Sequence, residues 1–255
     1  MGKLSKAIIA TVLFSDSVLF VKAQDGYKWM IGINAGAMIY QGDLTPSAFG
    51  SYKTASPVFG FSVARILNPY FALRGNAFFG KLRGDDAVYN NPSWRKSRAL
   101  NFSTPVTEFS AQVIWNPFGN NSNELGMKVT PYLFGGAGVS FLNIKRDYSK
   151  MDTTVFSFNS KTQTGLKQDT GTVPPRSLFV LPAGAGLSFY LSQRWSLNYE
   201  LSFRYTFTDY LDGFSYVANP KQKDFYHSHT VGLVYRFGGG GNNSRDKLGC
   251  PQMKY

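Results

Sequence analysis

Two histidines and three aspartates near the end of the sequence are the residues best placed to do chemistry. His227 and His229 are the two histidines of the chain, and Asp209, Asp212 and Asp224 precede them. An Asp/His pair could act in hydrolysis, and a His-x-His pair could bind a metal ion. Only two metal ligands are evident, however, and GxSxG, HExxH, Walker and dinucleotide-binding motifs are missing from the sequence. We therefore predict no catalytic residue, metal site or cofactor, and an enzyme that uses these histidines stays an alternative.

Cys250 is the single cysteine of the chain and stands close to its C-terminal end. In an exported protein, a lone cysteine indicates an intermolecular disulfide or a free thiol. We hypothesise that Cys250 forms a disulfide with a periplasmic or lipoprotein partner, and an unpaired thiol is the alternative. Both interpretations depend on export.

Residues 1–23 have the layout of a secretory signal peptide. Lys3 and Lys6 precede a short apolar segment, and Val21 and Ala23 stand at positions −3 and −1 of a cleavage site. We expect a mature chain made of a barrel over 24–237 and a short tail over 238–255. The sequence has no apolar run of about 18 residues or more, so it predicts no membrane-spanning helix.

The composition is basic and aromatic but poor in charge. The 255 residues include 27 Lys+Arg against 15 Asp+Glu, a formal net charge of +12, and 16% aromatic residues. Only 16% of the residues are charged, compared with about 25% in an average soluble domain. These values exclude a coiled coil, a disulfide-rich miniprotein and a disordered acidic chain. A basic chain could bind nucleic acid, but an exported protein has little access to it, and we predict no such partner.

Eight segments of the sequence alternate apolar and polar residues. In the clearest, Trp195–Phe207, every second residue is aromatic or leucine, and this period of two predicts a strand. The segment is longer than a typical soluble strand of about 5–6 residues and suits a tilted membrane strand of about 9–11. The other seven segments are Tyr27–Tyr40, Pro57–Leu67, Tyr70–Gly80, Leu100–Trp115, Val129–Phe141, Leu178–Leu191 and His227–Phe237.

The connections between these segments alternate between short and long. The short ones are 68–69, 116–126 and 192–194, and the long polar ones are 41–56, 81–99, 142–177 and 208–226. This alternation is typical of an outer-membrane barrel, and a sheet in lipid must close because lipid offers no hydrogen-bond partners. We predict an all-β fold: a closed eight-stranded antiparallel barrel that spans the outer membrane. Its long loops are expected to be extracellular, and its short turns, both chain ends and the C-terminal tail periplasmic. A soluble all-β fold is the alternative.

Five charged residues are predicted to face the inside of this barrel. A barrel of eight strands has room for side chains but not for an aqueous pore. Charges in so narrow a lumen must pair, because an isolated buried charge is costly. We therefore expect an interlocked network of ion pairs and a closed barrel, and a proton or ion path is the alternative. The five residues are Arg74, Glu108, Glu200, Arg204 and Arg236.

Positive charge is concentrated in the long loops. Facing an outer leaflet of lipopolysaccharide, such residues would pair with phosphate groups, so outer-membrane lipids and lipopolysaccharide are expected partners. The loop cations are Lys81, Arg83, Arg95, Lys96, Arg98, Lys145, Arg146, Lys150, Lys161, Lys167 and Arg176.

Several short motifs resemble the PorG-type outer-membrane subunit of the type IX secretion system of Bacteroidota. They lie along most of the mature chain, after the first strand, before and within later strands, and in the tail. The motifs are Ile39–Leu44 (IYQGDL), Arg98–Phe102 (RALNF) leading into Glu108, Thr130–Gly136 (TPYLFGG) and Cys250–Pro251.

This resemblance implies a non-enzymatic role. The family's member sits in the outer membrane and contacts a periplasmic ring built from the lipoprotein PorK and its partner PorN, while a separate, larger barrel forms the translocation pore. The partner-binding residues would then be periplasmic, and Cys250 could link to the PorK-like lipoprotein. Without such a machine, the basic loops would suit a surface barrel that binds envelope or host polyanions. The implied partner-binding residues are the turn Asn116–Asn123, Gln193, Arg194, Arg245, Lys247, Cys250, Pro251 and Tyr255.

Overall fold

A computed structural model describes residues 27–47, 49–157, 160–218 and 223–239. Eight long strands form its body: β1 (Trp29–Gln41), β2 (Ser56–Ile66), β3 (Phe71–Asp85), β4 (Asn101–Trp115), β5 (Val129–Leu142), β7 (Ser177–Tyr190), β8 (Trp195–Thr206) and β9 (Phe225–Phe237). The connections add the short strand β6 (Lys145–Asp147), helices α1 (Trp94–Arg98) and α2 (Lys161–Gly171), and 3₁₀ turns at Tyr52–Thr54 and Asp86–Val88. The predicted signal peptide, 1–23, and tail residues 240–255 lie outside the described residues.

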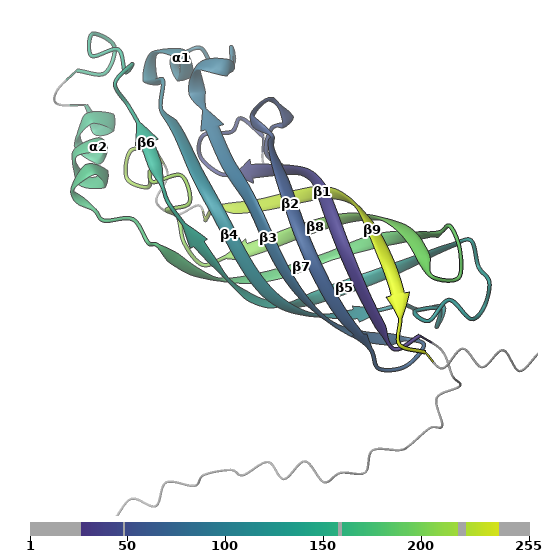
Figure 1. Ribbon diagram of the computed structural model, residues 1–255. Coiled ribbons are helices and arrows are strands. Elements are labelled where there is room, and N and C mark those ends of the chain that lie inside the picture. The colour runs from purple at the N-terminus through teal and green to yellow at the C-terminus, as the bar shows by residue number, and fades with distance from the viewer. Residues whose placement is uncertain (1–26, 48, 158–159, 219–222, 240–255) are drawn as a thin grey trace, which may run out of the picture.

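The eight long strands close on themselves. Each pairs antiparallel with its neighbour along the chain, and β9 pairs with β1 from Trp29↔Phe237 to Gln41↔Phe225. The sheet therefore has no free edge among these strands, and Figure 1 shows the tilted barrel that results. The predicted closed eight-stranded antiparallel barrel is confirmed.

Strand β3 is longer than predicted. The sequence prediction ends it at Gly80, because Lys81 and Arg83 resemble loop residues, but the strand continues to Asp85. Alternation in fact persists, since Leu82 is buried on the inner face while Lys81 and Arg83 are exposed on the outer one. Pairing with β4 continues to Asp85↔Asn101. The wall is therefore taller on the β3–β4 side.

The two ends of the barrel differ in structure. At the loop end, the connections 42–47, 49–55, 86–100, 143–157, 160–176, 207–218 and 223–224 fold over the mouth, and both helices belong to this end (Figure 1). Leu44, Leu100, Leu211 and Phe214 of these connections are buried in one apolar cluster with Tyr40 and Phe102 of the strands. At the turn end, the short connections 67–70, 116–128 and 191–194 join the strands. The long loops thus form a packed cap.

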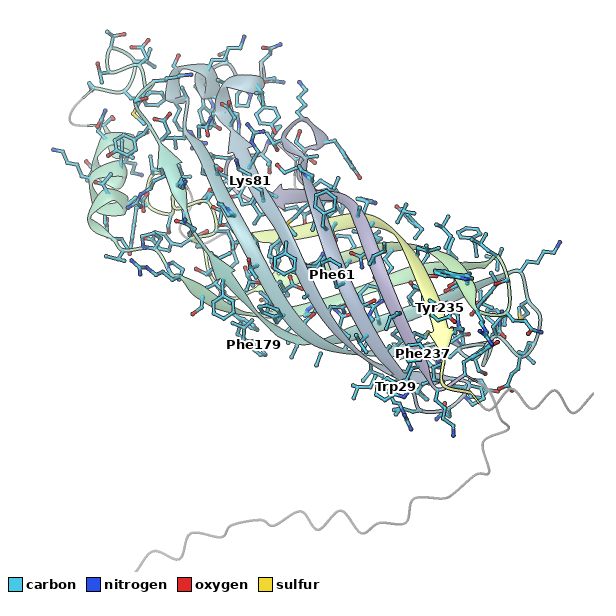
Figure 2. The ribbon with its side chains drawn as sticks, in the orientation of Figure 1. Trp29, Phe61, Lys81, Phe179, Tyr235 and Phe237 are labelled. Atoms are coloured by element: carbon cyan, nitrogen blue, oxygen red, sulfur yellow. The ribbon has the colours of Figure 1, made fainter. Side chains whose placement is uncertain are left out.

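The outer wall is apolar and the inner wall is polar. On β8, Trp195, Tyr199 and Phe203 are exposed, whereas their alternates Glu200 and Arg204 are buried. Aromatic rings gather at the turn end, where Figure 2 shows Trp29, Tyr235 and Phe237 close together. An apolar exterior with aromatic ends is the arrangement of a barrel wall that faces lipid. No helix within the described ranges is both long and apolar enough to cross a membrane.

Two adjacent glycines on β5 provide a matched test of how closely the strands approach. A Cβ on Gly136 would lie 2.0 Å from the carbonyl oxygen of Ala111 on β4, whereas a Cβ on Gly135 would meet nothing within 4 Å. We expect Gly136→Ala to impair barrel assembly and Gly135→Ala to be tolerated. Heat-modifiable mobility on gels after refolding measures the folded fraction. Equal folded fractions for the two variants would contradict this account of the wall.

Candidate functional site

One buried cluster lies inside the barrel, around Glu200 of β8. Arg74 Nη1 on β3 is 2.5 Å from Glu200 Oε1 on β8, and Tyr132 on β5 donates to the same oxygen at 2.6 Å. Arg74 Nη2 also donates to Gln112 Oε1 at 2.7 Å. Strands β3 and β5 therefore meet at a carboxylate of β8, and Gln112 of β4 holds the arginine in place. The lumen cavity beside Arg74 and Glu200 has a volume of about 20 Å³, which is room for about one water molecule.

A second buried pair lies nearer the loop end. Arg204 Nε on β8 donates to Glu108 Oε2 on β4 at 3.2 Å, and both side chains are fully buried. Tyr226 on β9 donates to the same carboxylate oxygen at 2.9 Å, and Arg204 also donates to Ser228. Glu200 and Arg204 share the inner face of β8, as their spacing indicates, but each pairs with a residue of another strand.

Arg236 lies apart from both ion pairs, at the turn end. Its Nε donates to the carbonyl of Asn121 at 3.1 Å, its Nη1 donates to Ser196 at 3.1 Å, and its guanidinium lies 4.6 Å from the ring centroid of Tyr190. Within the described residues it has no carboxylate partner. Because Asn121 belongs to turn 116–128, Arg236 fixes that turn across the end of the lumen.

Part of the turn 116–128 is therefore buried, while Phe118 and Leu125 of the same turn are exposed. Asn116, Asn120 and Asn121 are buried, and Tyr190 donates to the carbonyl of Asn120 at 2.7 Å. In the neighbouring turn, Gln193 and Arg194 are exposed. Of the residues implied as partner-binding, Pro117 and Phe118 of the turn Asn116–Asn123 are also exposed at the turn end. Arg245, Lys247, Cys250, Pro251 and Tyr255 lie outside the described residues.

Three arginines of the loops are structural and do not face outward, contrary to the expectation that the loop cations face lipopolysaccharide. Arg95 and Arg98 of helix α1 are buried, and they donate to the two oxygens of the fully buried Asp86 at 2.7 and 2.6 Å. Arg146 donates to the carbonyl oxygens of Asp169 and Gly213 at 2.7 and 2.9 Å. The other loop cations named above are exposed.

Asp169 of helix α2 ties two loops together. Its Oδ1 accepts hydrogen bonds from the backbone N–H groups of Ser215 and Tyr216, and its Oδ2 accepts one from Val217 at 2.9 Å. The carboxylate is fully buried. A buried carboxylate with this many backbone donors fixes helix α2 against residues 215–217.

Asp212 and Asp224 share one hydroxyl inside the cap. Tyr40 Oη lies 2.8 Å from Asp212 Oδ2 and 2.7 Å from Asp224 Oδ1. A tyrosine hydroxyl carries one hydrogen and can donate to only one carboxylate. The second short contact requires a proton on an aspartic acid, which then donates to the phenolic oxygen. Hydrogen counting therefore places at least one proton on this pair.

The electrostatics of the cap agree with a shared proton. Burial raises the pKa of Asp212 well above its ordinary value, and the charge of Asp224 raises it further. Burial likewise raises the pKa of Asp224, and the nearby Asp209 adds to it. Burial also raises the pKa of Asp209 itself to about 6. Loss of the shared proton would leave two buried carboxylates that make no ion pair with a cation of the described part of the chain.

Gly42 explains part of the Ile39–Leu44 motif. A Cβ on this glycine would lie 2.0 Å from Asp224 Oδ1 and 2.0 Å from Tyr40 Oη. Any larger residue would therefore displace the group that shares the proton. The sequence analysis singles out this motif but does not identify Tyr40, Asp86 or Asp169 as site residues, because no local pattern relates them to their partners. The glycine between Tyr40 and Asp43 was the available signal.

The histidines do not join the aspartates. His227 and His229 occupy outward positions of β9, whereas Tyr226 occupies an inward one and Asp224, just before the strand, is buried in the cap. Tyr52 Oη lies 3.0 Å from His229 Nε2, and Tyr199 Oη lies 2.7 Å from His229 Nδ1. Both ring nitrogens of His229 are therefore engaged, and the Asp/His pair of the enzyme alternative does not form. Among the described residues, no group of three or more acidic, histidine or cysteine side chains could hold a metal ion.

A family model described as a domain of unknown function (DUF6089) matches residues 6–240. The chain belongs to this family. No curated protein matches it.

Solved structures of small outer-membrane proteins are similar to the chain. Ail of Yersinia pestis, in complex with the heparin analogue sucrose octasulfate, has 15% identity and a TM-score of 0.44 over 83% of this chain and 99% of its own. Neisserial surface protein A has 15% identity and a TM-score of 0.45 over 82% and 97%. OprG of Pseudomonas aeruginosa has 11% identity and a TM-score of 0.44 over 84% and 98%.

The buried pair in the lumen yields a stability prediction. Arg204→Ala leaves Glu108 buried without its cation, and we expect a loss of about 3–5 kcal/mol in the free energy of unfolding. Urea unfolding in detergent, followed by tryptophan fluorescence, measures it. The double variant Arg204→Met/Glu108→Leu should lose much less, because no charge is left unpaired. An unchanged unfolding midpoint for Arg204→Ala would refute a structural role for this pair.

The shared proton yields a pH prediction. The folded cap raises the pKa of Asp212 above the unfolded value of 3.8, so the stabilisation is complete below that value and is lost as pH rises through the folded pKa. Limited proteolysis of the loops should therefore be faster at about pH 9 than at about pH 5. Asp212→Asn should remove most of this dependence, because its amide can donate to Tyr40 at any pH.

Asp152→Asn serves as the matched control, since Asp152 is exposed in another loop. It should keep the pH dependence of the unmodified protein. The shared-proton account fails if Asp212→Asn and Asp152→Asn give the same proteolysis profile.

Proposed function

We propose that this chain is a non-enzymatic outer-membrane barrel that anchors a periplasmic ring of type IX secretion machinery to the outer membrane. The observation that carries the proposal is the filled lumen. The two ion pairs, the turn held by Arg236 and the packed cap leave the barrel nothing to conduct. A closed barrel can act only through its surfaces, which suits an anchor, and the resemblance to PorG-type subunits supplies the class of partner.

The proposed orientation places the turn end and both chain ends in the periplasm. This follows the usual rule that short turns face the periplasm and long loops the exterior. The exposed side chains at the turn end include Lys28, Arg65, Lys128 and Arg194. Their positive charge would complement an acidic face of a ring protein. Gln193 lies beside them, and the tail that bears Arg245, Lys247, Cys250, Pro251 and Tyr255 follows the strand that ends at this side.

A complementation experiment in the cells of origin tests the anchor. We expect deletion of 242–255 to abolish co-purification of the PorK-like lipoprotein and its PorN-like partner, with the barrel still folded and in the outer membrane. Cys250→Ser should remove any reductant-sensitive adduct on non-reducing gels, whereas the control Ser244→Ala should keep it. Undiminished recovery of the ring by the truncated barrel would refute anchoring through the tail.

A second candidate is a surface barrel that binds envelope or host polyanions through its loops. The exposed Lys96, Lys150 and Lys161 at the loop end favour it. Replacing these three lysines by glutamate should abolish binding of intact cells to a sulfated polysaccharide in this case. It should leave ring recovery unchanged, which separates this candidate from the anchor.

A further inference from the structure

Three cations lie together on the outer face of the taller part of the wall. Lys81 and Arg83 occupy outward positions of β3, and Lys145 lies on β6. The strand register aligns Arg83 with Ser103 of β4, and Ser103 with Lys145. The two aligned cations are thus two strand spacings apart, about 10 Å between backbones, which their long side chains can bridge.

These cations are not neutralised by the described part of the chain. All three are exposed, and none makes an ion pair or side-chain hydrogen bond with the described residues. Asp85 follows Arg83 by two residues on β3, and Asp147 follows Lys145 by two residues on β6, and neither makes an ion pair with these cations. Asp85 accepts from Ala87 N and Asn101 Nδ2, and Asp147 accepts from Ser149 N. The three positive charges are therefore available to an anionic partner.

A row of aromatic rings lies directly below the cations. Phe79, Phe109 and Phe141 come from β3, β4 and β5, and successive rings pack edge to face with centroids 6.4 Å apart. Their exposed fractions are 42%, 50% and 51%. Such a row marks the level at which a wall passes from headgroups to hydrocarbon.

A hollow in the apolar wall lies below this row, on β2, β3 and β4. It has a volume of about 540 Å³, and Gly75, Ala77 and Ala111 form its floor between Phe61, Val63 and Phe109. The floor is low because these three residues have no side chain beyond Cβ. Ala77 is four residues from Lys81 along β3, about 13 Å at the usual rise of a strand. Figure 2 places Lys81 on the loop-end side of Phe61.

We propose that this face binds a phosphorylated glycolipid of the lipid A class. Its phosphate groups lie on Lys81, Arg83 and Lys145, and one of its acyl chains passes the aromatic row and fills the hollow. Three cations suit a headgroup with more than one phosphate, and a zwitterionic phospholipid gains less because its own ammonium group opposes them. Free phosphate would use the cations but not the hollow, so the hollow selects the lipid.

Lipid binding to the full chain in detergent tests the site. Diphosphoryl lipid A is titrated into the protein, and native mass spectrometry counts the bound lipid. Lys81→Gln/Arg83→Gln/Lys145→Gln should weaken binding by about fivefold per charge, or about 100-fold in total. The control Lys96→Gln/Lys150→Gln/Lys161→Gln removes the same charge elsewhere on the cap and should change binding less than about threefold.

A second variant tests the hollow independently of charge. A Cβ on Gly75 would meet only the carbonyl oxygen of Val63, at 3.9 Å, so Gly75→Leu can fill the hollow without disturbing the wall. It should weaken lipid A binding and leave the heat-modifiable folded fraction unchanged. Ala111→Leu on the neighbouring strand replaces it if Gly75→Leu does not fold.

Three outcomes would overturn the proposal. They are equal losses in the two triple variants, lipid A binding that does not change when the hollow is filled, and equal affinity for phosphatidylethanolamine. Competition by inorganic phosphate alone would assign the cations to a free anion instead. The inference rests on the proposed membrane location but not on the anchor, because ring recovery depends on the tail and lipid binding on the β3–β4 wall.

Discussion

Closure of the sheet is the constraint on which the rest of this structure depends. A strand edge in lipid has no hydrogen-bond partner, and β9 meets β1 over thirteen register positions, from Trp29↔Phe237 to Gln41↔Phe225. With eight strands, closure leaves a lumen only as wide as its side chains. An inward charge must then be stabilised by groups a few ångströms away, as Arg236 is by the carbonyl of Asn121 and the hydroxyl of Ser196. Arg74 with Glu200 and Arg204 with Glu108 are the result, and a sealed barrel is the consequence.

In the cap at the loop end, buried carboxylates are stabilised in three different ways. Asp86 is neutralised by two arginines, Asp169 is held by backbone N–H groups, and Asp212 with Asp224 depends on a shared proton at Tyr40. Asp169 links two connections, the shared proton links one connection to β1, and Arg95 also donates to the carbonyl oxygens of Asp43 and Thr45 in another connection. The loops consequently continue the packed interior of the barrel, and most of their buried residues stabilise the cap itself.

The sequence predicts the barrel well and the cap poorly. The reason is that the strand pattern is local, whereas the contacts of the cap join residues that are far apart in the sequence. Alternation along Trp195–Phe207 is a local property of one strand, and it also yields the inward residues of the lumen. The end of β3 was misplaced because Lys81 and Arg83 look like loop residues when the buried Leu82 between them is ignored. Arg95 and Arg98 were assigned to the exterior because their partner, Asp86, lies in a segment with no period. Tyr40 and Asp212 are 172 residues apart, so no local pattern relates them.

Because the wall is taller on the β3–β4 side, two opposite sides of the barrel differ in their chemistry. On the β3–β4 side, the paired strands rise past the aromatic row and present bare cations. Across the barrel, on β9, His229 lies between Tyr52 and Tyr199, and both of its ring nitrogens are in hydrogen-bond contact with them. Lipids and proteins that surround the barrel in a crowded leaflet would therefore contact two chemically different sides. The orientation of the barrel about its axis would then decide which side a given neighbouring protein contacts.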